Sequence, residues 1–114
     1  MQDILLRYDD IIQSYEILQD EITETSRKFK IKINFINSTK LEGREFIFPD
    51  KRNYSFQWMN EDNSLIIRWD NAEHHRNLDN FPHHRHTSNN QQVESSIEIT
   101  LDEVLLYIKN EIQS

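Results

Sequence analysis

The sequence predicts an α+β fold, in which an antiparallel β-meander of about four to five strands carries an N-terminal and a C-terminal helix packed on it. Three observations lead to this prediction. Apolar residues recur at helical spacing near both ends of the chain, they alternate with polar residues between residues 28 and 69, and short polar segments separate the alternating runs. Because strands joined by short connections pair antiparallel, the middle of the chain predicts a meander.

The N-terminal segment predicts an amphipathic helix over about residues 2–13. Its apolar residues recur at helical spacing, at Ile4, Leu5, Tyr8, Ile11, Ile12 and Tyr15. The pattern does not define the end of this helix, because residues 14–22 fit either a helix or a first edge strand.

Strict alternation in residues 28–35 is the clearest strand signal in the chain. Phe29, Ile31, Ile33 and Phe35 fall on one side, and Lys28, Lys30, Lys32 and Asn34 fall on the other. One face of this strand is therefore expected to be buried. Further strands are predicted over residues 41–48, 54–58 and 65–69, with polar turns between them.

The C-terminal helix is predicted to begin at Leu101. Thr100 and Glu103 have the spacing of a capping box, and Ile99 and Val104 have that of a hydrophobic staple. An apolar stripe follows, made of Leu101, Val104, Leu105, Ile108 and Ile112. We expect this stripe to cover one face of the sheet.

Length and composition favour a single cytoplasmic domain. The 114 residues are too few for two ordinary domains, so we expect one domain over residues 1–114. The chain has no cysteine, which excludes disulfides and thiolate metal sites and fits a reducing compartment. It shows no secretion signal and no apolar run of about 20 residues, so we expect neither export nor a membrane span.

The net charge of −7 is unevenly distributed. Residues 1–27 and 94–114 carry net charges of −5 and −4, whereas residues 28–67 carry +2 and residues 68–93 carry none with neutral histidines. The acidic ends suit a basic partner, and the middle can still accept a phosphate group. Ordinary solubilising charge explains the same distribution equally well.

A histidine-rich segment is the candidate functional site. All five histidines lie within thirteen consecutive positions, at His74, His75, His83, His84 and His86. Arg68 and Asp70 introduce them, two residues apart at the end of a predicted strand, so both side chains are expected on the same face. We take residues 68–96 as the site loop, because a polar stretch of this length in a small domain is either functional or disordered.

These side chains suit two kinds of chemistry. In RNA cleavage, a neutral histidine takes a proton from a ribose 2′-hydroxyl group or from water and a protonated histidine gives one to the leaving oxygen, while Arg68 stabilises charge at phosphorus. In the other chemistry, two or three imidazoles and Asp70 hold a divalent metal ion that activates water. The chain has no HExxH signature. No cofactor is therefore expected, and a divalent metal stays an alternative.

The same residues also have structural interpretations. Arg68 and Asp70 can form a plain ion pair on a strand, and the histidines can cap a turn or pack on the surface. Trp58 and Trp69 are expected in the core rather than as platforms for base stacking. Glu45 fits either a buried acid that faces the histidines or an exposed strand position.

Two linked motifs resemble the hallmark of the TumE family, toxins of TumE/TumA toxin-antitoxin systems in prokaryotes. They are RWDNAEHH, from Arg68 to His75, and FPHHRH, from Phe81 to His86. The resemblance extends to Glu45, to Tyr54 and to the C-terminal TLDEV segment. It implies a small α+β protein, a helix-turn-helix antitoxin as its partner, and ribonuclease activity as the presumed reaction.

The chain departs from the family pattern at two places. Glu73 stands where the family tends to have proline before the histidine pair, and residues 37–39 replace its usual Asp-Gly turn. Glu73 can either loosen the loop or act as an additional ligand, so the metal alternative gains some weight.

The leading hypothesis is a toxin that acts as an endoribonuclease through Arg68, Asp70 and the clustered histidines, with RNA as its substrate. The alternative is a non-catalytic binding module whose histidine loop binds a partner or a divalent metal. A third hypothesis, that this chain is the neutralising member of its pair, is disfavoured because the chain is acidic and has no helix-turn-helix pattern. The sequence leaves the oligomeric state open, a homodimer included.

Overall fold

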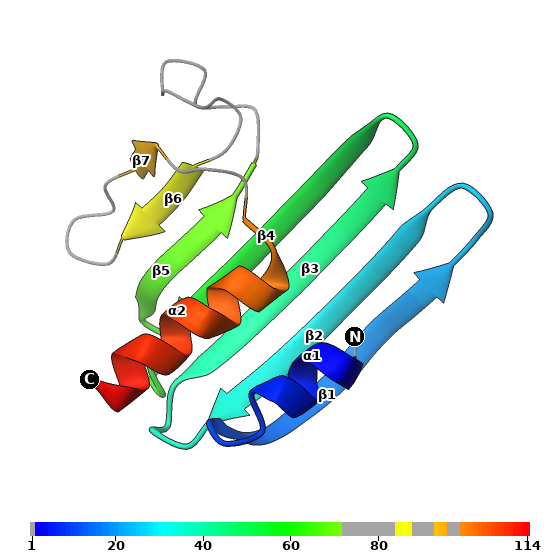
Figure 1. The fold of residues 1–114 in the computed structure, drawn as a ribbon. Coiled ribbons are helices and arrows are strands. Elements are labelled where there is room, and N and C mark those ends of the chain that lie inside the picture. The colour runs from blue at the N-terminus through cyan, green and yellow to red at the C-terminus, as the bar shows by residue number, and fades with distance from the viewer. Residues whose placement is uncertain (1, 72–83, 88–92, 96–98) are drawn as a thin grey trace.

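The computed structural model describes residues 2–71, 84–87, 93–95 and 99–114 (Figure 1). Within these residues the elements are α1 (Gln2–Arg7), β1 (Ile12–Ile22), β2 (Arg27–Phe35), β3 (Lys40–Phe48), β4 (Lys51–Met59), β5 (Leu65–Asp70), β6 (His84–Thr87), β7 (Val93–Ser95) and α2 (Leu101–Gln113). Each strand pairs antiparallel with its neighbours in the chain. The predicted α+β meander is confirmed by β1 to β5, and the short strands β6 and β7 extend it beyond β5.

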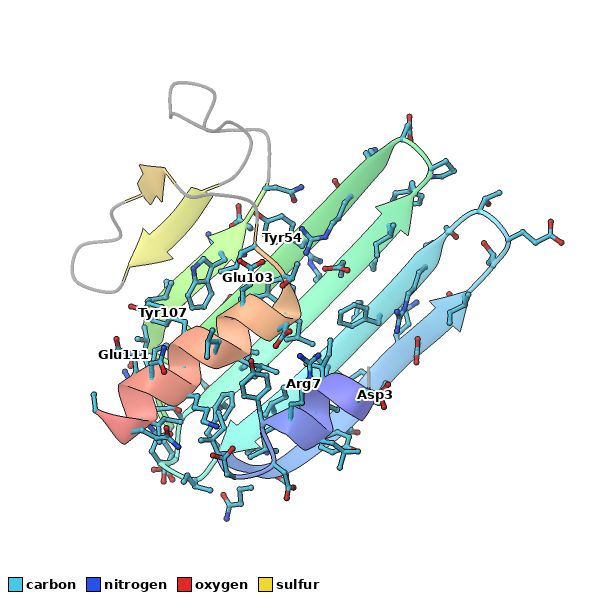
Figure 2. All side chains as sticks on the ribbon, in the orientation of Figure 1. Asp3, Arg7, Tyr54, Glu103, Tyr107 and Glu111 are labelled. Carbon is cyan, nitrogen blue, oxygen red and sulfur yellow. The ribbon has the colours of Figure 1, made fainter. Side chains whose placement is uncertain are left out.

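Both helices cover the same face of the sheet, and the core lies between them and the strands (Figure 1). β2 contributes Phe29, Ile31, Ile33 and Phe35, and α2 contributes Leu101, Val104, Leu105 and Ile108. Trp58 and Trp69 are also buried, as predicted, and Tyr107 of α2 packs edge-on against both rings (Figure 2). Neither of the two helices described is long and apolar enough to cross a membrane.

The N-terminal helix is shorter than the sequence predicts. α1 ends at Arg7 rather than near residue 13, and β1 begins at Ile12. Turns fill the interval, with the Ile11 amide donating to the Tyr8 carbonyl oxygen at 3.1 Å. These turns keep Tyr8 and Ile11 in the core. The helical spacing of apolar residues therefore extends beyond the end of α1 and through these turns.

Residues 14–22, which the sequence left undecided, are a strand. β1 pairs with β2 along its length, but the register shifts between Ile12 and Ser14 and again between Ile17 and Gln19. Such bulges interrupt the alternation of inward and outward positions. The segment therefore lacks the period of two that identifies a strand in a sequence.

The capping box predicted at the start of α2 is present. Thr100 Oγ1 accepts a hydrogen bond from the Glu103 amide at 3.3 Å, and Glu103 Oε1 accepts one from the Thr100 amide at 3.2 Å. The same turn of α2 is tied to the N-terminal segment. Tyr8 Oη donates to Asp102 Oδ1 at 2.7 Å, and Arg7 Nη1 donates to Asp102 Oδ2 at 2.9 Å.

Candidate functional site

Arg68 and Asp70 lie at the end of β5, on the face of the sheet that the helices leave uncovered. Trp69 between them is buried in the core, so alternation along the strand places its two neighbours on the other face. Arg68 Nε lies 3.2 Å from Asp70 Oδ2. The prediction that both side chains share one face is therefore confirmed.

Asp70 is 6% exposed and is the one buried charged residue among those the structure describes. Removing a carboxylate from water costs several kcal/mol unless an opposite charge and hydrogen bonds compensate. Arg68 supplies an opposite charge, and its own side chain stays 37% exposed. The pair therefore places a fixed positive group at the surface beside a shielded negative one, an arrangement that can bind a phosphate and orient an imidazole.

Strand β6 aligns two of the histidines with this pair. His84 is the register partner of Asp70, and His86 is the register partner of Arg68. Positions paired in this way belong to the same face of an antiparallel sheet, about 4.5–5.5 Å apart. The site loop expected over residues 68–96 is not irregular throughout, because it includes the end of β5 and the short strands β6 and β7. Pairing with β5 gives the backbone of β6 its hydrogen-bond partners, and β7 pairs in turn with β6.

The other candidate histidines, His74, His75 and His83, lie outside the described residues, as do the side chains of His84 and His86. The convergence of the imidazoles on Arg68 and Asp70 stays a prediction. In the described part of the chain, no group of three or more histidine and carboxylate side chains is placed to hold a metal ion.

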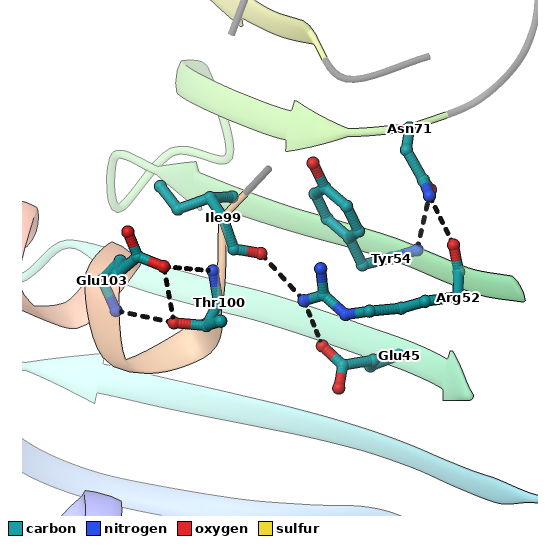
Figure 3. Close-up of polar contacts among 7 residues, drawn as sticks. All are labelled: Glu45, Arg52, Tyr54, Asn71, Ile99, Thr100 and Glu103. Carbon is teal, nitrogen blue, oxygen red and sulfur yellow. Dashed lines mark hydrogen bonds and ion pairs between the residues drawn. The ribbon is translucent and has the colours of Figure 1, made fainter. Parts of the chain in front are cut away.

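A second polar cluster lies on the helix-covered face, beside the start of α2 (Figure 3). Arg52 Nη2 donates to Glu45 Oε2 at 2.5 Å and to the Ile99 carbonyl oxygen at 2.8 Å. The guanidinium carbon of Arg52 lies 4.3 Å from the centroid of the Tyr54 ring. Asn71 accepts a hydrogen bond from the Tyr54 amide at 2.9 Å and donates one to the Arg52 carbonyl oxygen.

This cluster holds both ends of the histidine segment. Asn71 precedes the segment and Ile99 follows it, and both bond to Arg52 of β4. Packing and hydrogen bonds that fix the supports of a site also fix its geometry. The Glu45–Arg52–Tyr54–Asn71 cluster is thus a support for the site.

Of the two interpretations of Glu45, the exposed strand position is wrong, since its side chain is only 12% exposed and paired with Arg52. That Glu45 faces the histidines stays a prediction. It lies on the opposite face of the sheet from Asp70. Sequence reasoning did not single out Arg52 and Asn71. The one available signal for Arg52 was its position two residues before Tyr54, on the same side of a strand.

The uncovered face also carries a groove that reaches the candidate site. Its lining includes Lys30, Lys32, Arg44, Gln57 and Arg68, which come from four neighbouring strands. The site at the end of β5 is therefore continuous with a surface rich in cationic side chains.

Comparison with known proteins identifies one family. The family model described as Toxin TumE matches residues 2–112, which include α1, all strands in the described part of the chain and all of α2 except its last residue. No curated protein and no solved structure matches the chain.

Proposed function

The chain belongs to the Toxin TumE family, and from this premise we propose that it is the toxin of a toxin-antitoxin pair and cleaves RNA. The observation that carries the proposal is the register at the end of β5, where His84 pairs with Asp70 and His86 with Arg68. It supports a site in which imidazole, guanidinium and carboxylate groups act on one phosphate.

The proposed mechanism divides the work among these groups. A neutral histidine removes the proton of a ribose 2′-hydroxyl group, and the 2′-oxygen bonds to the adjacent phosphorus. The bond from phosphorus to the 5′-oxygen breaks as a protonated histidine donates a proton to that oxygen, which leaves a 2′,3′-cyclic phosphate. Arg68 binds the non-bridging oxygens and stabilises the charge that develops on them. Asp70 orients Arg68 and accepts a hydrogen bond from an imidazole. His84 and His86 are the first candidates for acid and base, and His74, His75 and His83 are the others.

Membership of a toxin family implies a cognate antitoxin as partner. We propose an antitoxin of the helix-turn-helix type, which would act with this chain in the cytoplasm. A DNA-binding protein of this type is usually basic, and the acidic ends of the chain complement such a partner.

The test compares two arginine–aspartate pairs on opposite faces of the sheet. Arg68→Gln and His84→Ala should each lower RNA cleavage by the purified protein about 100-fold or more. They should also abolish growth inhibition when the protein is expressed without its antitoxin. Arg7→Gln removes the same charge from the Arg7–Asp102 pair, which lies 2.9 Å apart on the helical side, and should leave both readouts unchanged.

The outcomes separate the proposal from its alternative. Full toxicity and cleavage in Arg68→Gln and His84→Ala would refute the assignment of the site. If the pure wild-type protein cleaves no RNA under any metal condition, while these variants lose binding to the antitoxin, the histidine segment is a non-catalytic binding module.

A further inference from the structure

Cationic side chains gather on the face of the sheet without helices. We define the open face as the positions on β2 to β5 that point away from the helices. Its seven cations are Lys28, Lys30, Lys32, Lys40, Arg44, Lys51 and Arg68, and its two acids are Glu42 and Asp70. On the adjoining edge strand β1, Glu21 and Glu16 are the register partners of Lys28 and Lys32, so the excess of cations is greatest on β2 to β5. The whole chain carries −7, so the fold sorts charge by face. A positive surface on an acidic protein attracts anionic partners to that surface alone.

The centre of the open face holds two like charges directly opposite each other. Lys30 of β2 is the register partner of Arg44 of β3, and like charges in this position destabilise a sheet. The next positions on either side are the neutral Gln19 and Ser55. Lys32, by contrast, lies 3.8 Å from Glu42. Among the described residues, neither Lys30 nor Arg44 has a carboxylate partner, so a bound anion would relieve their repulsion.

Rows of paired positions connect this pair of cations to the candidate site. One row runs Lys30, Arg44, Ser55, Asp70 and His84, and the next runs Lys32, Glu42, Gln57, Arg68 and His86. Neighbouring strands lie about 4.8 Å apart, so Lys30 and Asp70 are separated by roughly 14 Å across the sheet. The groove along this face is lined from Lys30 to Arg68. A chain of phosphates on the cations can therefore reach the site without leaving the face.

Two aromatic rings on the open face favour a nucleic acid over an acidic peptide. Phe46 and Phe48 of β3 are partly exposed. Lys28 lies 5.8 Å from the centroid of the Phe46 ring, and Lys51 lies 5.6 Å from that of Phe48. Cations next to aromatic rings on a sheet are typical of single-stranded RNA binding, in which phosphates contact the charges and bases stack on the rings.

From these observations we infer that the open face binds the phosphate backbone of single-stranded RNA and guides it to the end of β5. The choice of RNA as the ligand rests on the proposed function, in which RNA is the substrate. Lys30 and Arg44 contact phosphates, and Phe46 stacks on a base. These are binding residues at a distance from the reacting phosphate.

The experiment measures binding apart from cleavage. The probe is a dye-labelled oligouridylate with 2′-O-methyl riboses, which cannot be cleaved through the 2′-hydroxyl group. Its anisotropy is recorded with the full chain from about 50 to about 200 mM salt. The double variant Lys30→Gln/Arg44→Gln should bind about tenfold more weakly or worse. Its slope of log affinity against log salt should fall by about 1.4, since each phosphate contact contributes about 0.7 for a single strand.

A matched control removes two cations from the helical side. Arg7 and Lys109 are ion-paired with Asp102 and Asp10, at 2.9 and 3.1 Å. Arg7→Gln/Lys109→Gln changes net charge by the same amount as the test variant, and its affinity and salt slope should match those of the wild type. Phe46→Leu should weaken binding of the oligouridylate about fivefold or more through lost stacking, with binding of inorganic polyphosphate unchanged.

Equal affinity of the wild type and Lys30→Gln/Arg44→Gln for the probe would overturn the inference, whatever the chain does to RNA. The inference would also be overturned if an oligoaspartate peptide bound as tightly as the oligouridylate probe and displaced it from the same cations. The open face would then be a binding site for an acidic protein segment. Loss of probe binding in the double variant supports the inference, even if the wild type cleaves no RNA. In that last case the proposed ribonuclease fails and the RNA-binding face stands.

Discussion

The two faces of the sheet differ in cover and in the sign of their charge. On one face, side chains from β1 to β5 pack under the two helices, whose outer surface is acidic (Figure 2). The charged residues of the two helices and of the turns after α1 are Asp3, Asp9, Asp10, Asp102, Glu103 and Glu111, with Arg7 and Lys109 as the cations. The open face carries the cations of β2 to β5, and it ends at Arg68 and Asp70.

Ion pairs neutralise cations on both faces, Lys32 and Arg68 of the open face included, but two cations of the open face are exceptions. Arg7 and Lys109 on the helical side each form an ion pair. Lys30 and Arg44 on the open face stand opposite each other without a carboxylate from the described residues. A charge arrangement that costs stability is expected where a ligand is bound rather than where the fold is held. We therefore expect the helix-covered face to contribute mainly to folding and the open face mainly to binding.

The largest expected effect comes from adjacent residues of β2 that point to opposite faces. Ile31 is 1% exposed in the core, and Ile31→Ala should lower the free energy of unfolding by about 2–5 kcal/mol. Lys30→Gln at the next position should change it by less than about 0.5 kcal/mol. The expected direction for Lys30→Gln is stabilising at low salt, since repulsion with Arg44 is removed. Urea unfolding of the two variants measures the difference.

A loss of stability in Lys30→Gln comparable to that in Ile31→Ala would break the comparison, because the open face would then hold the fold. Lys32→Gln is a useful control on the same strand and face. It breaks the exposed pair with Glu42, so its effect should be small and opposite in sign to that of Lys30→Gln.

Sequence patterns predicted the strands and the helix that build the core, because each is defined by its own residues. The alternation from Phe29 to Phe35 and the capping box of Thr100 and Glu103 are local signals. The end of α1 was not predictable in this way. The end of α1 depends on tertiary pairing. Ile12 pairs with Phe35 of β2, and this strand pairing is incompatible with a helix that continues through Ile12.

For the candidate site, the sequence predicted the shared face of Arg68 and Asp70 but not what surrounds them. Alternation along one strand is sufficient to predict that Arg68 and Asp70 share a face. The register of His84 opposite Asp70 depends on pairing between segments that a polar loop separates. The support from Arg52 depends on contacts with Glu45 and with the backbone of Ile99. Contacts between residues far apart in the chain produce no repeating pattern of residue types, so they could not be predicted from the sequence.

The contact of Tyr8, in the turn after α1, with Asp102 of α2 is expected to depend on pH. The hydrogen bond from Tyr8 to Asp102 lowers the pKa of that carboxyl, and Arg7 lowers it further. Burial and the same contact raise the pKa of Tyr8 to about 12. A lowered carboxyl pKa stabilises the fold above the unfolded value of about 3.9, and this stabilisation is lost as pH falls through the folded pKa. A raised tyrosine pKa stabilises it below about 10, and this is lost as pH rises to about 12.

Tyr8→Phe removes the hydroxyl group that links both effects. Its melting temperature should lie below that of the wild type by a constant amount from about pH 5 to 9, corresponding to about 1 kcal/mol for one hydrogen bond. The gap should narrow below about pH 4 and above about pH 10. A gap independent of pH would show that the contact does not couple to titration. RNA binding on the open face should be the same in both proteins.

The smallest expected effect lies in the hairpin turns, which belong to neither face. Ser38 joins β2 to β3 with a φ of 70°, and Asn63 joins β4 to β5 with a φ of 71°. Glycine adopts this conformation without the steric cost that a side chain incurs, and asparagine tolerates it better than serine does. Ser38→Gly should therefore raise the free energy of unfolding by up to about 1 kcal/mol, and Asn63→Gly should raise it by less. Calorimetry measures both. Affinity for the oligouridylate probe should not change in either variant, because Ser38 and Asn63 belong neither to the core nor to the cations of the open face. A gain in stability without a change in affinity would show that the turns affect folding and not binding.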